Sequence, residues 1–433
     1  MNAIWAVVAR LVTMVTSFGS GVVISRLVIG EAGVDSFALY SLVAALPALV
    51  PFADMGTGAV LVNSLARESD PVENRTVRAE LRTVLRIMTI FAGGLMLLNL
   101  ILLVTGGWRV VLGAAHVDGA DVAVFACISI FALSIPLGIW SRLLLGMRRN
   151  HIVILIQGAQ PVIALLIIWC ICRVENQNNS LLLIVAPYVA LTAVALIGSL
   201  VADRSVSGLL RGAALEVAHP VSHPGVRVMN VGWPMLVQAL TPPITTQLGR
   251  FILAQTTTAY ALAQYGLLNQ VVTPLIGLVS AAGMTLWPYY SRARERGHRS
   301  LNPLILVGVF GFASTIAVGV WLLVADPMFA IMSDEKIRVP ASLIACFGAQ
   351  VLVQALVYPL GMSIMSPAGI RFQLLPAVLV AVSTVIGIVL LAPTWGIVAA
   401  PLVSAAAVLA FQVLPFSVYV ARERRARPIG PNE

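Results

Sequence analysis

The stretch LLLIVAPYVALTAVALIGSLVA (181–202) decides the fold class, because it carries no charged side chain and has the roughly 20 apolar residues that a transmembrane helix needs. Similar stretches recur along the 433 residues, of which 59% are hydrophobic and only 10% charged. Soluble domains carry about 25% charged residues. So few charges cannot cover a water-facing surface, and lipid has to cover most of this one.

The apolar pattern predicts an all-α polytopic membrane protein of about twelve transmembrane helices in two six-helix lobes. The predicted spans are residues 3–29, 37–65, 84–105, 121–146, 152–173, 181–202, 229–254, 258–290, 303–325, 340–363, 371–392 and 395–420. The first stretch lacks a basic segment and a clear cleavage site, so it is predicted to be a retained helix rather than a signal peptide.

The distribution of basic residues predicts the topology. The net charge of +9 would suggest nucleic acid binding in a soluble protein, but here the charge lies in short loops, so no nucleic acid partner is expected. Most of the 27 basic residues fall in alternate loops, and only Arg109, Arg173, Lys336 and Arg338 fall in the other set. This positive-inside bias predicts a multi-pass protein of the bacterial inner membrane with both termini in the cytoplasm.

A weak internal repeat suggests how the chain divides. Residues 37–67 resemble residues 262–292, with Tyr40 matching Tyr265. Because six spans in each half give both halves the same orientation, the lobes are predicted to be related by a pseudo-two-fold axis along the membrane normal. The predicted parts are an N-terminal lobe (1–202), a cytoplasmic inter-lobe loop (203–228), a C-terminal lobe (229–420) and a basic cytoplasmic tail (421–433).

Ionisable residues inside predicted spans are costly and usually serve a purpose. Arg26 and Arg250 lie near the outer ends of spans one and seven, at matching depths in the two halves. If both face a cleft between the lobes, their guanidinium groups suit pyrophosphate binding. The alternative is that both side chains reach out to the lipid headgroups. The symmetry favours the cleft.

Asp54 and Arg10 lie near the inner leaflet on spans two and one. As neighbours on antiparallel helices they could form an ion pair, which lowers the insertion cost of both. The pair would serve either as a contact between helices, the interpretation we favour, or as a site of proton or cation coupling.

Amide side chains gather on spans seven and eight. Gln247, Gln255, Gln264 and Asn269 are suited either to lining a cavity that binds a glycan or to hydrogen bonds between helices. Pro242-Pro243 falls within span seven and should break it. A broken helix at membrane depth is tolerated where it lines a cavity, which favours this helix as part of a transport path.

The sequence gives no support for catalysis or for a cofactor. It contains no G-x-x-x-x-G-K-[ST], G-x-S-x-G or H-E-x-x-H motif. The four cysteines are predicted to be buried small hydrophobic residues. His219 and His223 are flanked by prolines that make a regular helix unfavourable, so no metal site is expected.

Two segments carry a family resemblance. Residues 24–68 contain an arginine before a Gly turn, a Tyr-x-Leu helix and the acidic bend at Asp54-x-Gly56, and residues 248–297 end in a Pro-x-x-Ser-Arg exit. They resemble bacterial polysaccharide (O-antigen type) flippases of the multidrug/oligosaccharidyl-lipid/polysaccharide exporter superfamily. The twelve-span plan matches over nearly the whole chain.

The resemblance implies two facing lobes and the movement of an undecaprenyl-pyrophosphate-linked oligosaccharide from the inner to the outer leaflet by alternating access. Arg26 and Arg250 are similar in place to cavity arginines of related lipid II flippases. The partners would be the lipid-linked oligosaccharide, membrane lipids, a polysaccharide polymerase and glycosyltransferases. Two alternatives stay open: a cation-coupled multidrug or small-solute antiporter of the same superfamily, and a non-transporting membrane scaffold of a polysaccharide synthesis complex.

Overall fold

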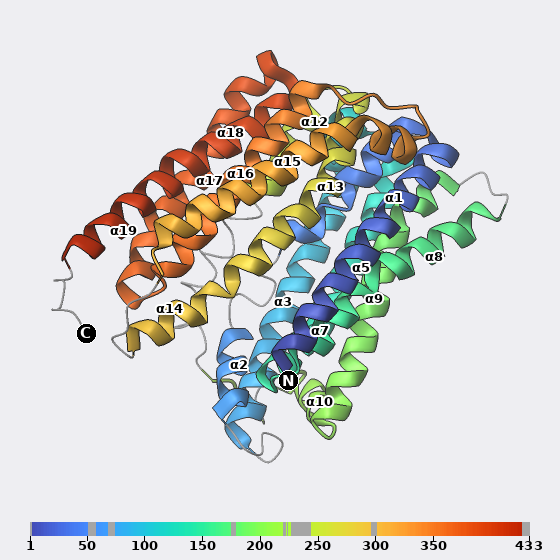
Figure 1. Cartoon of the computed structure of the whole chain (residues 1–433). Coiled ribbons are helices and arrows are strands. Elements are labelled where there is room, and N and C mark those ends of the chain that lie inside the picture. The colour runs from blue at the N-terminus through green and yellow to red at the C-terminus, as the bar shows by residue number, and fades with distance from the viewer. Residues whose placement is uncertain are drawn as a thin grey trace. The chain divides into compact units, whose positions relative to one another are not determined.

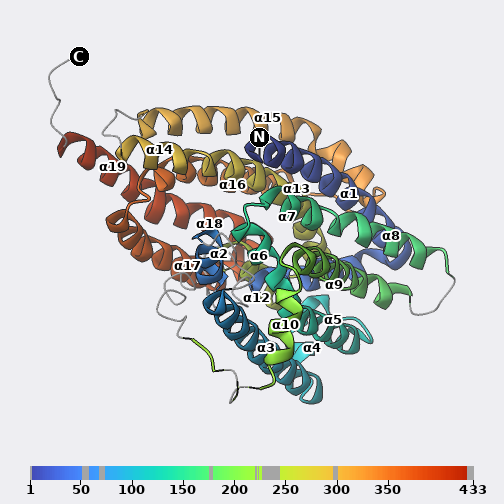
Figure 2. The same ribbon diagram turned by 90° about the horizontal axis from the view of Figure 1, so that it is seen from below.

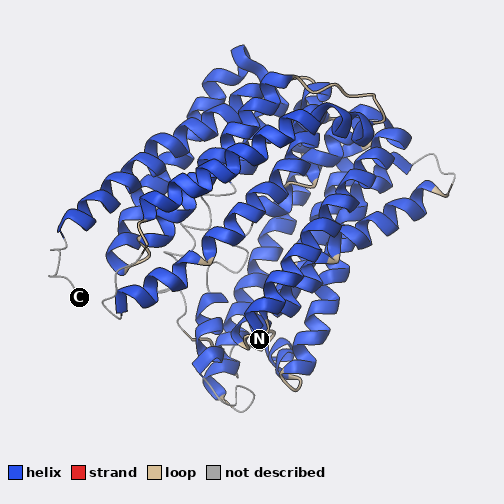
Figure 3. Cartoon of the chain, viewed as in Figure 1, coloured by secondary structure: helices blue, strands red, loops and turns tan. Residues whose placement is uncertain are grey.

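The computed structural model describes residues 2–50, 58–67, 74–174, 179–219, 222, 224–226, 244–295 and 301–426. Within these ranges the chain is helical and contains no strand (Figure 3). The predicted all-α membrane fold class is therefore confirmed.

Among the described residues, nine helical segments are long and apolar enough to cross a membrane. They are Val12–Leu49, Arg75–Val104, Ala120–Gly146, Asn150–Cys172, Asn179–Ser205, Ala259–Arg294, Pro303–Ser333, Ala341–Ser363 and Ala368–Glu423. The last has 56 residues, which at about 1.5 Å per residue is long enough for two crossings. Much of predicted span seven lies outside the described residues, so the number twelve stays a prediction.

Two glycines break helices, Gly33 in a predicted turn between spans and Gly396 at the second residue of predicted span 395–420. Helix α1 (Asn2–Val43) consists of two helices joined at Gly33, whose φ of 83° and ψ of 176° lie in a region essentially restricted to glycine. Helix α17 (Pro367–Trp395) ends at Gly396, with a φ of 59°. Gly33 thus separates the first two predicted spans, whereas the break at Gly396 falls just inside the last one.

Replacing Gly33 by alanine should lower the free energy of unfolding by about 1–3 kcal/mol, because a Cβ atom strains this backbone conformation although no atom lies within 4 Å of it. Gly30→Ala is the matched control, since its Cβ would also meet open space but its φ is not positive. Thermal unfolding of the detergent-solubilised variants would measure the difference. Equal midpoints would contradict the role of Gly33.

The contacts divide the chain into two compact units, Met1–Pro243 and Ile244–Glu433. The helices of the first unit are α1, α2 (Gly58–Arg67), α3 (Arg75–Val104), α4 (Gly107–Leu112), α5 (Ala120–Ser134), α6 (Trp140–Gly146), α7 (Asn150–Gly158), α8 (Gln160–Cys172), α9 (Asn179–Ser205) and α10 (Leu209–Glu216). Helix α9 packs against α1, α5, α6 and α8 (Figure 1). The buried Tyr188 hydroxyl of α9 donates to the Val43 carbonyl at 2.6 Å, which ties α9 to the end of α1.

The second unit contains α12 (Gly249–Thr256), α13 (Ala259–Met284), α14 (Leu286–Glu295), α15 (Pro303–Ser333), α16 (Ala341–Ser363), α17, α18 (Ala399–Val408) and α19 (Leu414–Ala426). Helix α16 packs against α13, α15 and α18. A buried polar chain joins three elements: Gln350 Nε2 donates to Ser404 Oγ at 3.3 Å, and Ser404 Oγ donates at 3.3 Å to the carbonyl of Thr245, in the π-helical turn Ile244–Leu248. The predicted lobe boundaries stay predictions. The predicted inter-lobe loop contains α10.

Candidate functional site

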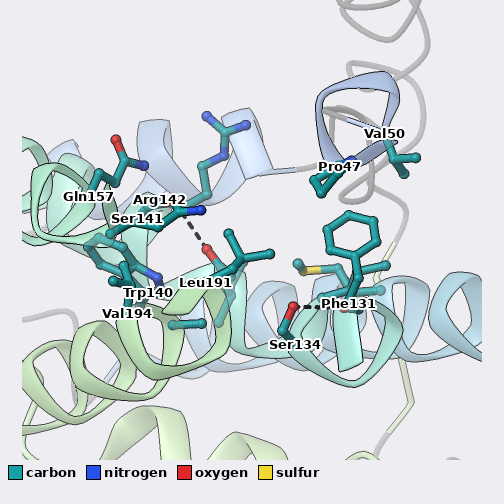
Figure 4. A pocket seen from close by; sticks show the side chains of 16 residues that line it. Pro47, Val50, Phe131, Ser134, Trp140, Ser141, Arg142, Gln157, Leu191 and Val194 are labelled. Atoms are coloured by element: carbon teal, nitrogen blue, oxygen red, sulfur yellow. Dashed lines mark hydrogen bonds between the residues drawn. The ribbon is translucent and has the colours of Figure 1, made fainter. Parts of the chain in front are cut away.

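The first unit contains a partly open cavity of about 480 Å³ (Figure 4), within the range of small-ligand pockets. Its walls come from α3, α5–α9 and the segment 47–50. The lining residues are Pro47, Val50, Met88, Phe131, Ser134, Ile135, Gly138, Ile139, Trp140, Ser141, Arg142, Gln157, Gln160, Leu191, Val194 and Ala195. Of these described residues, none carries a carboxylate.

The cavity has a polar end and an apolar end. Figure 4 shows Arg142 and Gln157 at one end, and Phe131, Pro47 and Val50 at the other. The serine hydroxyls of the lining turn back to their own helices: Ser134 Oγ donates to the Phe131 carbonyl at 2.7 Å, and Ser141 Oγ to the Gly138 carbonyl at 3.1 Å. The guanidinium of Arg142 and the amide of Gln157 therefore give the polar end its chemistry, and Gln160 adds a second amide to the lining.

Two broken helices position these polar side chains. Helix α5 ends at Ser134, a 3₁₀ turn over Pro136–Ile139 follows, and α6 then carries Arg142. Helix α7 ends at Gly158, and α8 begins at Gln160 with Pro161 in its first turn. Irregular backbone at membrane depth is tolerated where it lines a cavity, so both breaks fit the position of this one.

Two glycines let helices approach closely beside the cavity. A Cβ atom on Gly198 of α9 would lie 2.3 Å from Cδ2 of Trp140, and one on Gly158 would lie 2.1 Å from Cγ2 of Thr13 on α1. The Trp140 side chain is buried, with 4% of its surface exposed. Because Gly198 has no side chain, the Trp140 ring, which is part of the cavity wall, can pack directly against α9.

In the second unit, Arg250 and Asn269 are brought together. Arg250 is half-buried on α12, with its guanidinium carbon 5.9 Å from the centre of the Tyr265 ring on α13. With its amide oxygen turned toward Arg250, Asn269 accepts a hydrogen bond from Arg250 Nε at 2.9 Å and donates to Thr273 Oγ1 at 3.2 Å. A cation held over an aromatic ring and beside an amide is suited to binding an anion or a sugar.

The three predicted glutamines lie in different surroundings. Gln264 is buried, and its amide donates to the Arg338 carbonyl at 2.5 Å, which ties α13 to the loop after α15. Gln247 is half-buried in the π-helical turn, and its amide oxygen is buried without a hydrogen bond. Gln255 is exposed near the end of α12. A role for any of them in binding a glycan stays a prediction.

The other predicted site residues belong to the first unit. Arg26 and Arg10 are both exposed on α1. Asp54 lies outside the described residues, so its pairing with Arg10 stays a prediction, as does the arrangement of Arg26 relative to Arg250. Pro242-Pro243 and His223 also lie outside the described residues.

The cysteines require one correction. Cys127 is buried, and Cys172 and Cys346 are half-buried, but Cys170 is exposed on α8. The prediction of four buried cysteines is wrong for Cys170, because this position near the end of α8 faces away from the unit. Within the described part of the chain, no group of three or more His, Cys, Asp or Glu side chains could hold a metal ion.

Sequence reasoning missed Arg142, Gln157 and Gln160. Arg142 was assigned only to the pattern of basic loops. The signals that could have found these residues are Pro136-x-Gly138 and Gly158-x-x-Pro161, two helix-breaking pairs inside predicted spans.

Comparisons with solved structures identify the fold. Lipid II flippase MurJ in an inward closed conformation matches with a TM-score of 0.62 and 13% identity, over 98% of this chain and 88% of that chain. An inward-facing multidrug resistance MATE family transporter of the MOP superfamily matches with a TM-score of 0.66 and 12% identity, over 97% and 99%. The Vibrio cholerae MATE transporter VcmN matches with a TM-score of 0.51 and 13% identity, over 97% and 99%.

Comparison with curated protein sequences finds no match. A family profile described as polysaccharide biosynthesis protein matches residues 1–294, which is more than half of the chain. The structural likenesses, all at low identity, show a multi-pass helical membrane fold. The chain therefore belongs to the polysaccharide biosynthesis protein family, and its fold is similar to those of lipid II flippase MurJ and the inward-facing MATE transporter.

Proposed function

We propose that this protein is a flippase that moves an undecaprenyl-pyrophosphate-linked oligosaccharide from the inner to the outer leaflet of the bacterial cytoplasmic membrane by alternating access. Its product would serve surface polysaccharide biosynthesis, and its partners would be a polymerase and glycosyltransferases. The observation that carries the proposal is the cavity of the first unit, whose described lining combines one arginine with two glutamines and has no carboxylate.

The chemistry of this lining fits a polar, anionic cargo. A guanidinium binds phosphate oxygens or a sugar carboxylate through two parallel hydrogen bonds, and glutamine amides both donate to and accept from sugar hydroxyls. A cationic drug would instead place its charge near the guanidinium of Arg142, and two like charges repel each other. The cavity thus favours the flippase over the cation-coupled antiporter.

Arg26 and Arg250 would hold the pyrophosphate from the two units. Arg250 is the better supported of the two, because Tyr265 and Asn269 orient its guanidinium. Gln247, Gln255 and Asn269 would contact the glycan. Asp54 and Arg10 would pair the first two spans, with coupling to a cation gradient as the alternative.

The test follows lipid-linked oligosaccharide across the membrane of a strain lacking this gene. Digestion of spheroplasts with a glycosidase that cannot cross the membrane measures the fraction of glycan in the outer leaflet. Wild-type protein should restore that fraction and the surface polysaccharide. Unchanged glycan orientation with changed resistance to cationic dyes would support the antiporter. Normal export with Arg26→Ala and Arg250→Ala combined would support the scaffold.

In the same assay Arg142→Gln should lower glycan export about 10-fold or more, because one charge-assisted hydrogen bond contributes about 1.5–3 kcal/mol and each 1.4 kcal/mol is tenfold in binding. The matched control is Arg173→Gln. Arg173 lies at the end of α8, with its guanidinium carbon 4.7 Å from the centre of the Trp169 ring, and it does not line the cavity. Equal export by the two variants would contradict a role for Arg142 in binding the cargo.

A further inference from the structure

Three arginines form a ladder along one face of α3. Arg78, Arg82 and Arg86 are spaced four residues apart, so their side chains lie one above another on the helix. Helix α10, which ends at Glu216, packs against this part of α3, and the two lie side by side in Figure 2. The ladder therefore faces the segment that leads out of the first unit.

Glu216 is the acidic partner of the ladder. One of its carboxylate oxygens accepts from Arg82 Nη1 at 2.6 Å, and the other pairs with Arg78. Arg82 also donates from Nη2 to the Pro224 carbonyl at 2.9 Å. Only 7% of Arg82 is exposed. Without Glu216, the positive charge of Arg82 would be buried without an opposite charge beside it, which is strongly destabilising. Glu216 therefore stabilises the buried position of Arg82.

The side chain of Arg86 binds backbone carbonyls at the end of α10. Its Nη2 donates to the carbonyls of Glu216 at 3.0 Å and His219 at 3.2 Å, and its Nε donates to the Val217 carbonyl at 3.1 Å. The last carbonyls of a helix have no partner within the helix and attract cations. Arg86 therefore caps α10 and holds the residues that follow it.

A final contact lies further along the segment. The Val226 backbone N–H donates to Thr83 Oγ1 at 3.0 Å, and a Cβ atom built on Gly225 would lie 3.9 Å from Cβ of Thr83. The described residues 216–219 and 224–226 are thus attached to α3 at several points over its first three turns. The second unit begins at Ile244, so the attached residues belong to the part of the chain that precedes the connection between the units.

We propose that residues 209–219 and 224–226 stay fixed to α3 throughout the transport cycle and that Glu216 is the positioning residue that keeps them there. These residues are then part of the first unit rather than of a loose loop between lobes. This inference goes beyond the proposed cargo, because it concerns the connection between the units whatever is transported.

The experiment uses a disulfide as a substitute for the ion pairs. The pair Thr83→Cys and Gly225→Cys has the Cβ separation of about 3.5–4.5 Å that a disulfide requires, and Cu(II)-phenanthroline would oxidise its two thiols. Each variant is made with Cys170 and Cys172 replaced by serine. Oxidation should leave glycan export unchanged. Loss of export that a reductant reverses would overturn the proposal, as would failure of the two cysteines to crosslink.

Glu216→Gln should raise the rate of trypsin cleavage after Arg211 in membrane vesicles at least fivefold and lower export. Glu335→Gln, which neutralises an exposed carboxylate after α15, should do neither. Adding the disulfide to Glu216→Gln should restore both properties. If export stays low although cleavage returns to normal, Glu216 does not act by positioning. If Glu216→Gln fails to insert, the disulfide in the otherwise wild-type chain decides alone. The crosslinking and cleavage measurements hold even if the protein moves no glycan.

Discussion

Arg250→Ala should lower glycan export about 10- to 100-fold while the amount of protein in the membrane stays the same. The guanidinium of Arg250 lies over the Tyr265 ring and beside Asn269, so its position is set before any cargo arrives. On the proposed function it donates charge-assisted hydrogen bonds to a phosphate, and losing them removes about 1.5–3 kcal/mol of binding. Arg250→Lys should give an intermediate rate, because lysine keeps the charge but lacks the planar fork. The spheroplast glycosidase assay measures glycan export by the two variants and by the wild-type protein.

Two controls separate binding from packing at this position. Arg338→Ala removes an exposed arginine from the same unit and should leave export unchanged. Asn269→Ala removes the amide beside Arg250 without removing the charge. If Asn269→Ala and Arg250→Ala lower the thermal midpoint and export equally, Arg250 serves only as a contact between α12 and α13.

Gly198→Ala should lower the free energy of unfolding by about 3 kcal/mol, at the upper end of the usual cost of overpacking. The new Cβ atom would lie 2.3–2.4 Å from two ring atoms of Trp140. The indole is buried, so its displacement has to move the cavity wall beside Arg142. Export should therefore fall even at temperatures where the variant stays folded. Thermal unfolding in detergent and the export assay would measure the two effects.

The same substitution in open space is the control for Gly198. Gly94 lies in α3, and a Cβ atom there would meet nothing within 4 Å. Gly94→Ala should be neutral or slightly stabilising, because alanine is the better helix former. Similar unfolding midpoints for the two alanine variants would mean that the Trp140 ring moves aside without a cost in stability. The close approach of α9 to Trp140 would then not contribute to the stability of the protein.

The membrane fold could be predicted from the sequence because hydropathy acts locally. Each apolar stretch favours a lipid environment. The break at Gly33 falls in a turn that the pattern places between spans, and the break at Gly396 falls one residue inside the last predicted span. The breaks that build the cavity were harder to interpret, because Pro136 and Gly158 lie inside stretches long and apolar enough to be predicted as single spans.

Long-range pairing explains most of what the sequence could not predict. Arg78, Arg82 and Arg86 read only as topology signals, since their partner Glu216 lies 138 residues from Arg78. Gln264 shows the same limit. An amide is a suitable group for binding a glycan, but in the structure the Gln264 amide donates to the Arg338 carbonyl. The spacing of residues in the sequence does not predict this contact.

The arginine and the two glutamines that line the cavity lie in one short stretch of the sequence. Arg142, Gln157 and Gln160 lie between the two breaks at Pro136 and Pro161, whereas the apolar end is assembled from distant segments. A single recombination event spanning this piece would transfer all three side chains together. If the proposed function holds, exchange of this one gene segment would therefore change the cargo preference while the rest of the protein sequence stays the same.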